Sequence, residues 1–180
     1  MSWLPPAKLE PTKGKARATA LDAVFGHRPN LYREFRDFYA LFWEAGLVEP
    51  ALLELCRLRI AAILGCESEL ALRYESAREA GLDESKIAAL DDWSHDERFS
   101  EFERAALAFA EMFVNDPHAI TDEDAHAVAK QLGDEGMVAF VEALALFDGF
   151  SRFRVMLGVA PEGDAAPLIR SPRVGDISLA

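Results

Sequence analysis

Apolar residues recur along most of the chain at the spacing of α-helices. The clearest run begins at Pro29 and ends at Gly46, and its apolar stripe consists of Leu31, Phe35, Phe38 and Phe42. Positions three or four residues apart lie on one face of a helix, so we expect this stripe to pack into a hydrophobic core. A shorter stretch of the same kind predicts a preceding helix from about Ala16 to Phe25.

Two further segments are apolar nearly all round. Residues 51–64 contain only three polar side chains, Glu54, Arg57 and Arg59. The second segment runs from Met137 to Leu157. A helix without a polar face has no side to turn toward water. We therefore expect these two helices at the centre of the fold.

Capping residues and glycines divide the rest of the chain. Ser100 followed by Glu103 forms a capping box, Thr121 is a second N-cap, and glycines mark several helix ends. The further helices predicted in this way are 66–80, a short one after Asp83, 100–115 and 121–133, and the segment from Met137 to Leu157 belongs to a helix over 134–158.

Composition supports a helical fold. The chain has 180 residues with 30 alanines, 22 leucines and 18 glutamates, against 18 valines, isoleucines and threonines together. Strong helix formers therefore dominate over β-branched residues. We expect one compact all-α domain of seven or eight helices over residues 16–158. An extended arm at residues 1–15 and a tail at residues 159–180 flank it.

Net charge and cysteine content exclude several classes of partner and cellular location. The formal net charge is −12, which disfavours nucleic acid and anionic membrane surfaces as partners, because both require a basic face. The first twenty residues lack the apolar region of a signal peptide, and only two cysteines occur. His118 and His126 match no usual metal-ligand spacing. We expect a cytoplasmic protein without a membrane span, metal or cofactor.

The charges in segment 51–64 need partners, because charged side chains are rarely buried unpaired. One interpretation is an intrahelical pair between Glu54 and Arg57, with Arg59 pointing elsewhere. The other is a carboxylate held in a low-dielectric cleft for proton transfer. The sequence alone leaves both open.

Two cysteines lie close in sequence, but a disulfide between them is not expected. Ten residues of helix separate their Cα atoms by about 15 Å, whereas a disulfide requires less than about 7 Å. Cys56 is interpreted as a small apolar side chain in a buried helix. Cys66 begins the next predicted helix, a position that favours thiol reactivity.

The stretch from Glu54 through Cys66 to Gly81 resembles the alkylhydroperoxidase D and carboxymuconolactone decarboxylase family. That family places a glutamate twelve residues before a C-x-x-C-x-x-x-H motif and then a helix closed by glycine. The similarity covers roughly residues 25–158, including the FERAALAFAE segment and the last long helix with Arg152 and Arg154. It implies an alkylhydroperoxidase D-like fold and a homotrimer or homohexamer. The terminal arms would reach neighbouring subunits.

The family motif is degenerate in this chain. The resemblance assigns the proton-relay glutamate to Glu54 and the first cysteine to Cys66. Glu69 stands in place of the second, peroxide-reactive cysteine, and Arg73 in place of the histidine. A thiol peroxidase needs a nucleophilic thiolate, a resolving thiol and a base. We therefore predict no thiol peroxidase turnover.

The residues that replace the family's second cysteine and histidine could themselves form an ion pair or bind a substrate. Glu69 and Arg73 are four residues apart and are expected to pair across one helical turn. The segment SELALR resembles the decarboxylase branch of the family, which acts on a small carboxylated lactone. Arg73, together with Arg57, would either hold a substrate carboxylate or neutralise Glu54 and Glu69.

Three hypotheses for the function are consistent with these residues. The first is a decarboxylase-like enzyme for a small anionic organic acid or lactone, with Glu54 as general base and Glu69 and Arg73 orienting charge. The second is a non-catalytic helical oligomer with a structural charge network. The third is a residual redox role through Cys66. An enclosed cavity near Glu54 and Arg73 favours the enzyme, and direct contact between them without a cavity favours the structural role.

Overall fold

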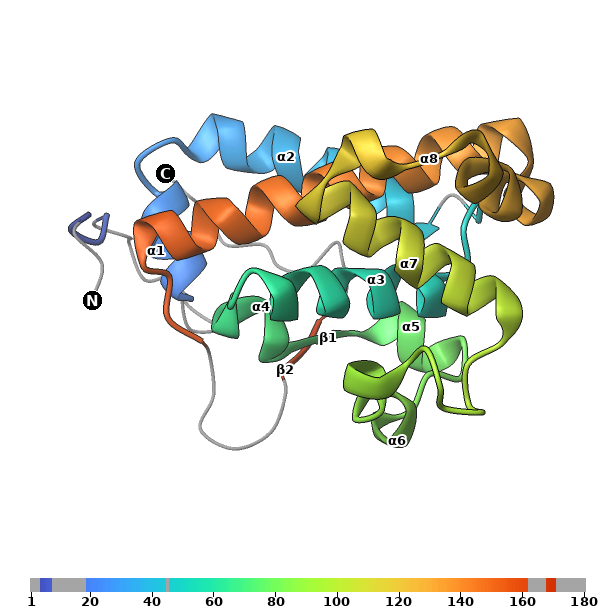
Figure 1. Cartoon of the computed structure of the whole chain (residues 1–180). Helices are drawn as coiled ribbons and strands as arrows, with labels where there is room; N and C mark the ends of the chain where they lie inside the picture. The colour runs from blue at the N-terminus through green and yellow to red at the C-terminus, as the bar shows by residue number, and fades with distance from the viewer. Residues whose placement is uncertain (1–3, 8–18, 45, 162–167, 171–180) are drawn as a thin grey trace.

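Three helices pack against one another to form the centre of the molecule (Figure 1). They are α3 (Pro50–Ile63), α7 (Glu101–Asn115) and α8 (Asp122–Leu157). The computed structural model describes residues 4–7, 19–44, 46–161 and 168–170. Within these ranges the fold is all-α, as predicted, with α3 and the second half of α8 in the core.

The remaining elements surround this centre (Figure 1). The helices are α1 (Ala20–Phe25), α2 (Pro29–Glu44), α4 (Glu67–Leu70), α5 (Glu75–Glu79) and α6 (Glu84–Ile87). Two 3-10 turns are formed by Leu90–Asp92 and Pro117–Ala119. Strand β1 (Leu72–Tyr74) pairs in parallel with β2 (Leu168–Arg170), with Leu72 opposite Leu168. None of the described helices is both long enough and apolar enough to cross a membrane.

Local capping chemistry determines where the helices begin. Ser100 and Glu103 form the expected capping box of α7, and Thr121 forms one with Asp124 at the start of α8. A third capping box at Thr19 begins α1, so the described part of the first predicted helix begins at Ala20 rather than near Ala16.

Helix α8 contains the break that the sequence predicts at Gly133. This glycine has φ 68° and ψ 177°, a backbone conformation that is essentially restricted to glycine. The two predicted helices 121–133 and 134–158 are therefore joined as one element with a kink. Gly158 ends the element in the left-handed conformation.

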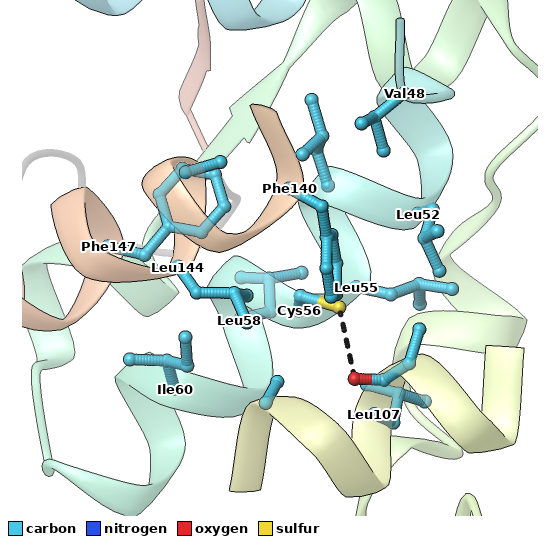
Figure 2. Close-up of a cluster of buried hydrophobic side chains, with 14 of the residues drawn as sticks. Val48, Leu52, Leu55, Cys56, Leu58, Ile60, Leu107, Phe140, Leu144 and Phe147 are labelled. Carbon is cyan, nitrogen blue, oxygen red and sulfur yellow. Dashed lines mark hydrogen bonds between the residues drawn. The ribbon is translucent and has the colours of Figure 1, made fainter. Parts of the chain in front are cut away.

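The main core lies between the three central helices. Figure 2 shows Phe140, Leu144 and Phe147 of α8 facing α3, with Leu107 of α7 on the other side. Cys56 sits among these side chains, as expected of a small apolar filler. A second cluster joins α1 to the end of α8 through Leu21, Phe25, Tyr32 and Val159.

The predicted single helix over residues 66–80 is wrong. The chain forms α4, then β1, then α5 instead. The backbone of β1 bonds to buried charged side chains in place of helical partners. The Leu72 carbonyl accepts hydrogen bonds from Arg57 and Arg73, and the Tyr74 N–H donates to Glu54. These bonds satisfy the extended backbone, which also pairs with β2.

The predicted arm and tail lie largely outside the described residues. Residues 4–7 contact α1, where the Ala7 N–H donates to the Ala23 carbonyl at 2.8 Å. His27 Nε2 lies 2.9 Å from the Pro5 carbonyl oxygen.

Candidate functional site

Arg57 is the centre of a buried network of charged side chains. Its Nε and Nη2 atoms each lie 2.8 Å from an oxygen of Glu54, one turn earlier in α3. Its Nη1 donates to the Glu69 carboxylate at 2.6 Å and to the Glu69 carbonyl at 2.9 Å, and Nη2 donates to the Leu72 carbonyl at 3.0 Å. A guanidinium has five N–H donors, and these five bonds use all of them.

The same contacts fix the charge of Arg57. Burial by itself would lower its pKa, but the adjacent Glu54 carboxylate and its hydrogen bonds, with Glu69, raise the pKa well above the usual value. The side chain is therefore a permanent cation. It has no donor left for a substrate carboxylate, the role that the sequence analysis suggested for it.

Glu69 links this centre to α8. One oxygen of the Glu69 carboxylate accepts from Arg57, and the other lies 2.5 Å from Nε of Arg154. The charge network is thus Glu54, Arg57, Glu69 and Arg154, two anions and two cations. All four residues are at most 3% exposed. The expected intrahelical pair of Glu54 and Arg57 is confirmed, while the contacts of Glu69 connect elements distant in sequence.

Aromatic side chains pack beside the charge network. The Arg57 guanidinium lies 5.1 Å from the centre of the Tyr74 ring, and the Trp43 ring stacks on that of Tyr74 with centroids 4.1 Å apart. Burial raises the pKa of Tyr74, and burial with the neighbouring Tyr74 raises that of Tyr39. Both phenols are therefore protonated at neutral pH.

Arg73 lies outside the charge network. Its Nε is 3.0 Å from the Glu84 carboxylate, and its Nη1 donates to the Leu70 and Leu72 carbonyls. The predicted pair between Glu69 and Arg73 is not formed, because Arg73 lies on a strand and not one helical turn after Glu69. Arg59 likewise points elsewhere, as expected, and pairs with Glu111 at 2.6 Å.

The two cysteines are free thiols in different surroundings. Cys56 is fully buried, and burial raises the pKa of its thiol far above the usual value. Cys66 precedes α4 and is also buried, with its sulfur 3.6 Å from the Ser68 hydroxyl oxygen. Cys66 borders a cavity.

The cavity has a volume of about 560 Å³ and lies between α1, the α3–α4 junction and the end of α8. Its polar side chains belong to Cys66, Glu67, Ser68 and Arg154. Glu54, Arg57, Glu69 and Arg73 are not part of its lining, so the charge network meets the cavity only through Arg154. The described residues include no group of three or more His, Cys, Asp or Glu side chains placed to hold a metal ion.

Arg154 and Ser68 were not among the site residues predicted from the sequence. Arg154 had the same signal as Arg57, a charge within a segment that is apolar nearly all round. Ser68 carries no comparable signal. Its position in the cavity lining becomes apparent only in the structure, where the α3–α4 junction lies beside α1.

Comparison with known proteins agrees with this fold. Residues 29–112 match the model of the carboxymuconolactone decarboxylase family. The uncharacterized protein YdfG of Bacillus subtilis (strain 168) is 26% identical over 106 residues, which are 58% of this chain and 72% of YdfG.

Two solved structures share the fold at 19% sequence identity. One is a protein of unknown function from Agrobacterium tumefaciens, provisionally assigned as the antioxidant-defence protein AhpD, with a TM-score of 0.67 over 78% of this chain and 97% of that one. The other is an uncharacterized peroxidase-related protein with an alkylhydroperoxidase AhpD core from Ralstonia eutropha JMP134. Its TM-score is 0.69 over 87% of this chain and 82% of that one. The family match thus covers residues 29–112, and the two solved structures show that the chain has the alkylhydroperoxidase D-like fold.

Proposed function

We propose that this protein is not a thiol peroxidase and that it acts on a small organic acid or lactone, as its resemblance to the carboxymuconolactone decarboxylase family suggests. One observation carries the proposal. The residue in place of the family's peroxide-reactive cysteine, Glu69, is held between Arg57 and Arg154. A carboxylate in that position supplies no sulfur to attack peroxide, and ion pairs with two guanidinium groups hold it in the buried charge network.

The other positions of the motif support the same conclusion. Arg73 is engaged by Glu84 and by backbone carbonyls, and a guanidinium does not exchange protons near neutral pH. Cys66 has a hydroxyl beside it and no second thiol three residues on. A sulfenic acid formed on Cys66 would have no resolving partner in the motif.

The purified protein is therefore expected to show no multiple turnover of hydrogen peroxide or an alkyl hydroperoxide with dithiol reductants. The measurement is peroxide consumption by the wild type beside Cys66→Ser, with Cys56→Ser as the matched control. At most one equivalent of peroxide should be consumed per chain. Repeated turnover that Cys66→Ser abolishes would show that Cys66 is a peroxide-reactive thiol that the reductant regenerates, and the proposal would be wrong.

A second candidate is the non-catalytic helical oligomer. It is favoured by the closed hydrogen bonding of the charge network, since Glu54 accepts from Arg57 and from the Tyr74 N–H and would have to leave both to act as a general base. In this account the charges stabilise one packing of α3, β1 and α8.

The two buried thiols are in keeping with a reducing cytoplasmic location, which we also propose.

We propose that the chain forms a homo-oligomer, a trimer or hexamer, through an apolar groove between α2 and α8. The groove has a volume of about 350 Å³ and is lined by Phe38, Leu41, Phe42, Leu47, Val48, Leu53, Glu135, Val138, Ala139 and Glu142. Leu41 is 53% exposed and Val138 67% exposed. Exposed apolar side chains gathered at one site are typical of an interaction surface. A second copy packed on the groove would cover these side chains. The exposed Arg33 of α2 in that copy would offer a positive charge to Glu135 and Glu142 of the groove.

Light scattering at micromolar concentration is expected to give a mass of about three or six times the 19.9 kDa of one chain. Leu41→Glu, which places a charge in the α2–α8 groove, should lower the mass toward that of one chain. Leu31→Glu is the control, because Leu31 is an exposed leucine of α2 outside the groove. A wild-type mass near 20 kDa would contradict the proposal.

A further inference from the structure

Helix α1 and residues 4–7 form one wall of the cavity beside Cys66. The lining residues that belong to this wall are Leu4, Pro6, Ala20, Ala23 and Val24. Cys66 borders the same cavity, yet it is only 1% exposed. Its thiol can therefore react with a molecule larger than water only if part of the surrounding structure moves.

Helix α1 packs against the protein through a cluster that is separate from the main core. Its buried apolar side chains, Leu21 and Phe25, both belong to the second cluster, together with Tyr32 of α2 and Val159 after α8. The rings of Phe25 and Tyr32 stack with centroids 4.4 Å apart. A helix of six residues is too short to be stable alone, so this small cluster keeps α1 in place. If α1 moves away, the main core keeps its own contacts.

A buried carboxylate takes part in the attachment of α1. Asp22 is 2% exposed, and its carboxylate accepts hydrogen bonds from the Thr19 backbone at 2.7 Å and from the Tyr32 hydroxyl at 2.9 Å. The bond to Thr19 is local and moves with α1, whereas the bond to Tyr32 joins α1 to α2 and breaks when α1 leaves. A carboxylate that leaves a buried position regains its hydration, which favours departure. The Tyr32 hydroxyl opposes this by stabilising the carboxylate where it is.

We propose that α1, together with residues 4–7, is a lid that opens and closes over the cavity while the helical core stays folded. Lids belong to the least stable parts of a fold, and a short helix on a small separate cluster has that character. Residues 4–7 move with α1, because the Ala7 N–H donates to the Ala23 carbonyl. Opening exposes the Cys66 thiol and the interior of the cavity. The lid would act on any small molecule that enters the cavity, whichever ligand the proposed function requires.

The test measures how fast each cysteine of the native full-length chain reacts with excess N-ethylmaleimide, by mass spectrometry of the digested protein. Cys56 lies in the main core, so in the same molecule it reports unfolding of the whole fold. We expect Cys66 to react about a hundredfold faster than Cys56, because opening of a lid costs less than global unfolding. Equal rates for the two thiols would show that α1 does not open apart from the core, and would overturn the proposal.

Two matched variants then identify the moving part. Tyr32→Phe removes the hydroxyl that holds Asp22 and should speed the reaction of Cys66 about tenfold, with the helical circular dichroism unchanged. Tyr39→Phe removes a hydroxyl from the same helix but within the main core, and it should leave the Cys66 rate unchanged. Acceleration by Tyr39→Phe would mean that Cys66 reacts through unfolding of the core. An unchanged rate in Tyr32→Phe would mean that the reagent reaches Cys66 without displacing α1. Either result would overturn the proposal.

Discussion

Arg57→Met is expected to lower the free energy of unfolding by about 3–5 kcal/mol. The substitution removes all five hydrogen bonds of the guanidinium and leaves Glu54 without a cation, while Glu69 keeps only Arg154. A buried carboxylate that loses its partner keeps its desolvation cost, which is why breaking one side of a buried pair is so destabilising. For a chain of this size the melting temperature should fall by roughly 6–20 °C.

Chemical denaturation of the purified variant measures this loss directly. Arg152→Met removes the same charge from an exposed pair with Asp148, and it should cost less than about 1 kcal/mol. The double variant Glu54→Gln/Arg57→Met, which removes the stranded anion, should recover part of the loss. A loss below about 1 kcal/mol in Arg57→Met would mean that the charge network does not stabilise the fold.

Phe140→Ala is expected to cost about 3–5 kcal/mol for a different reason. Phe140 is fully buried on α8, and its ring lies 6.0 Å from that of Phe109 on α7. Figure 2 shows it directly beside Cys56 of α3. Truncation leaves a cavity where the three central helices meet, and close-packed cores relax only partly around such a cavity.

Urea unfolding of Phe140→Ala, followed by circular dichroism, provides the measurement. Leu31→Ala, at a leucine that is 55% exposed, serves as the surface control and should stay within about 0.5 kcal/mol of the wild type. Equal losses in the two variants would contradict the central position of α8.

The fold was predictable where its causes are local. Segment 51–64 and the run from Met137 to Leu157 are apolar nearly all round, and that alone assigns them to the core. Capping boxes at Ser100 and Thr121 involve residues three positions apart, so the sequence displays both partners. The break at Gly133 was visible for the same reason.

The strand β1 was not predictable, because its causes are distant in sequence. SELALRYESARE has the composition of a helix. What extends it is hydrogen bonding to Arg57 and Glu54 from the preceding helix and pairing with β2 from the far end of the chain.

The candidate site was also predictable only where its contacts are local in sequence. The pair of Glu54 and Arg57 follows from their spacing within one helix, and the sequence analysis offered it as one of two interpretations. Which cations would meet Glu69 depends on how α3, α4 and α8 pack, and periodicity does not contain that information. The position of Arg154 between Glu69 and the cavity is visible only in three dimensions.

The cavity beside Cys66 is lined by segments that lie far apart in the sequence and are therefore synthesised at different times. Leu4 and Pro6 come from the beginning of the chain, and Arg154 through Pro161 come from near its end. The core side chains Phe140, Leu144 and Phe147 all emerge earlier than Arg154. During synthesis, therefore, the helical core can assemble before the cavity exists. A chain cut short between Phe147 and Arg154 would keep those core residues and lose Arg154 and the apolar residues after it, so the cavity depends on residues that are made after the core.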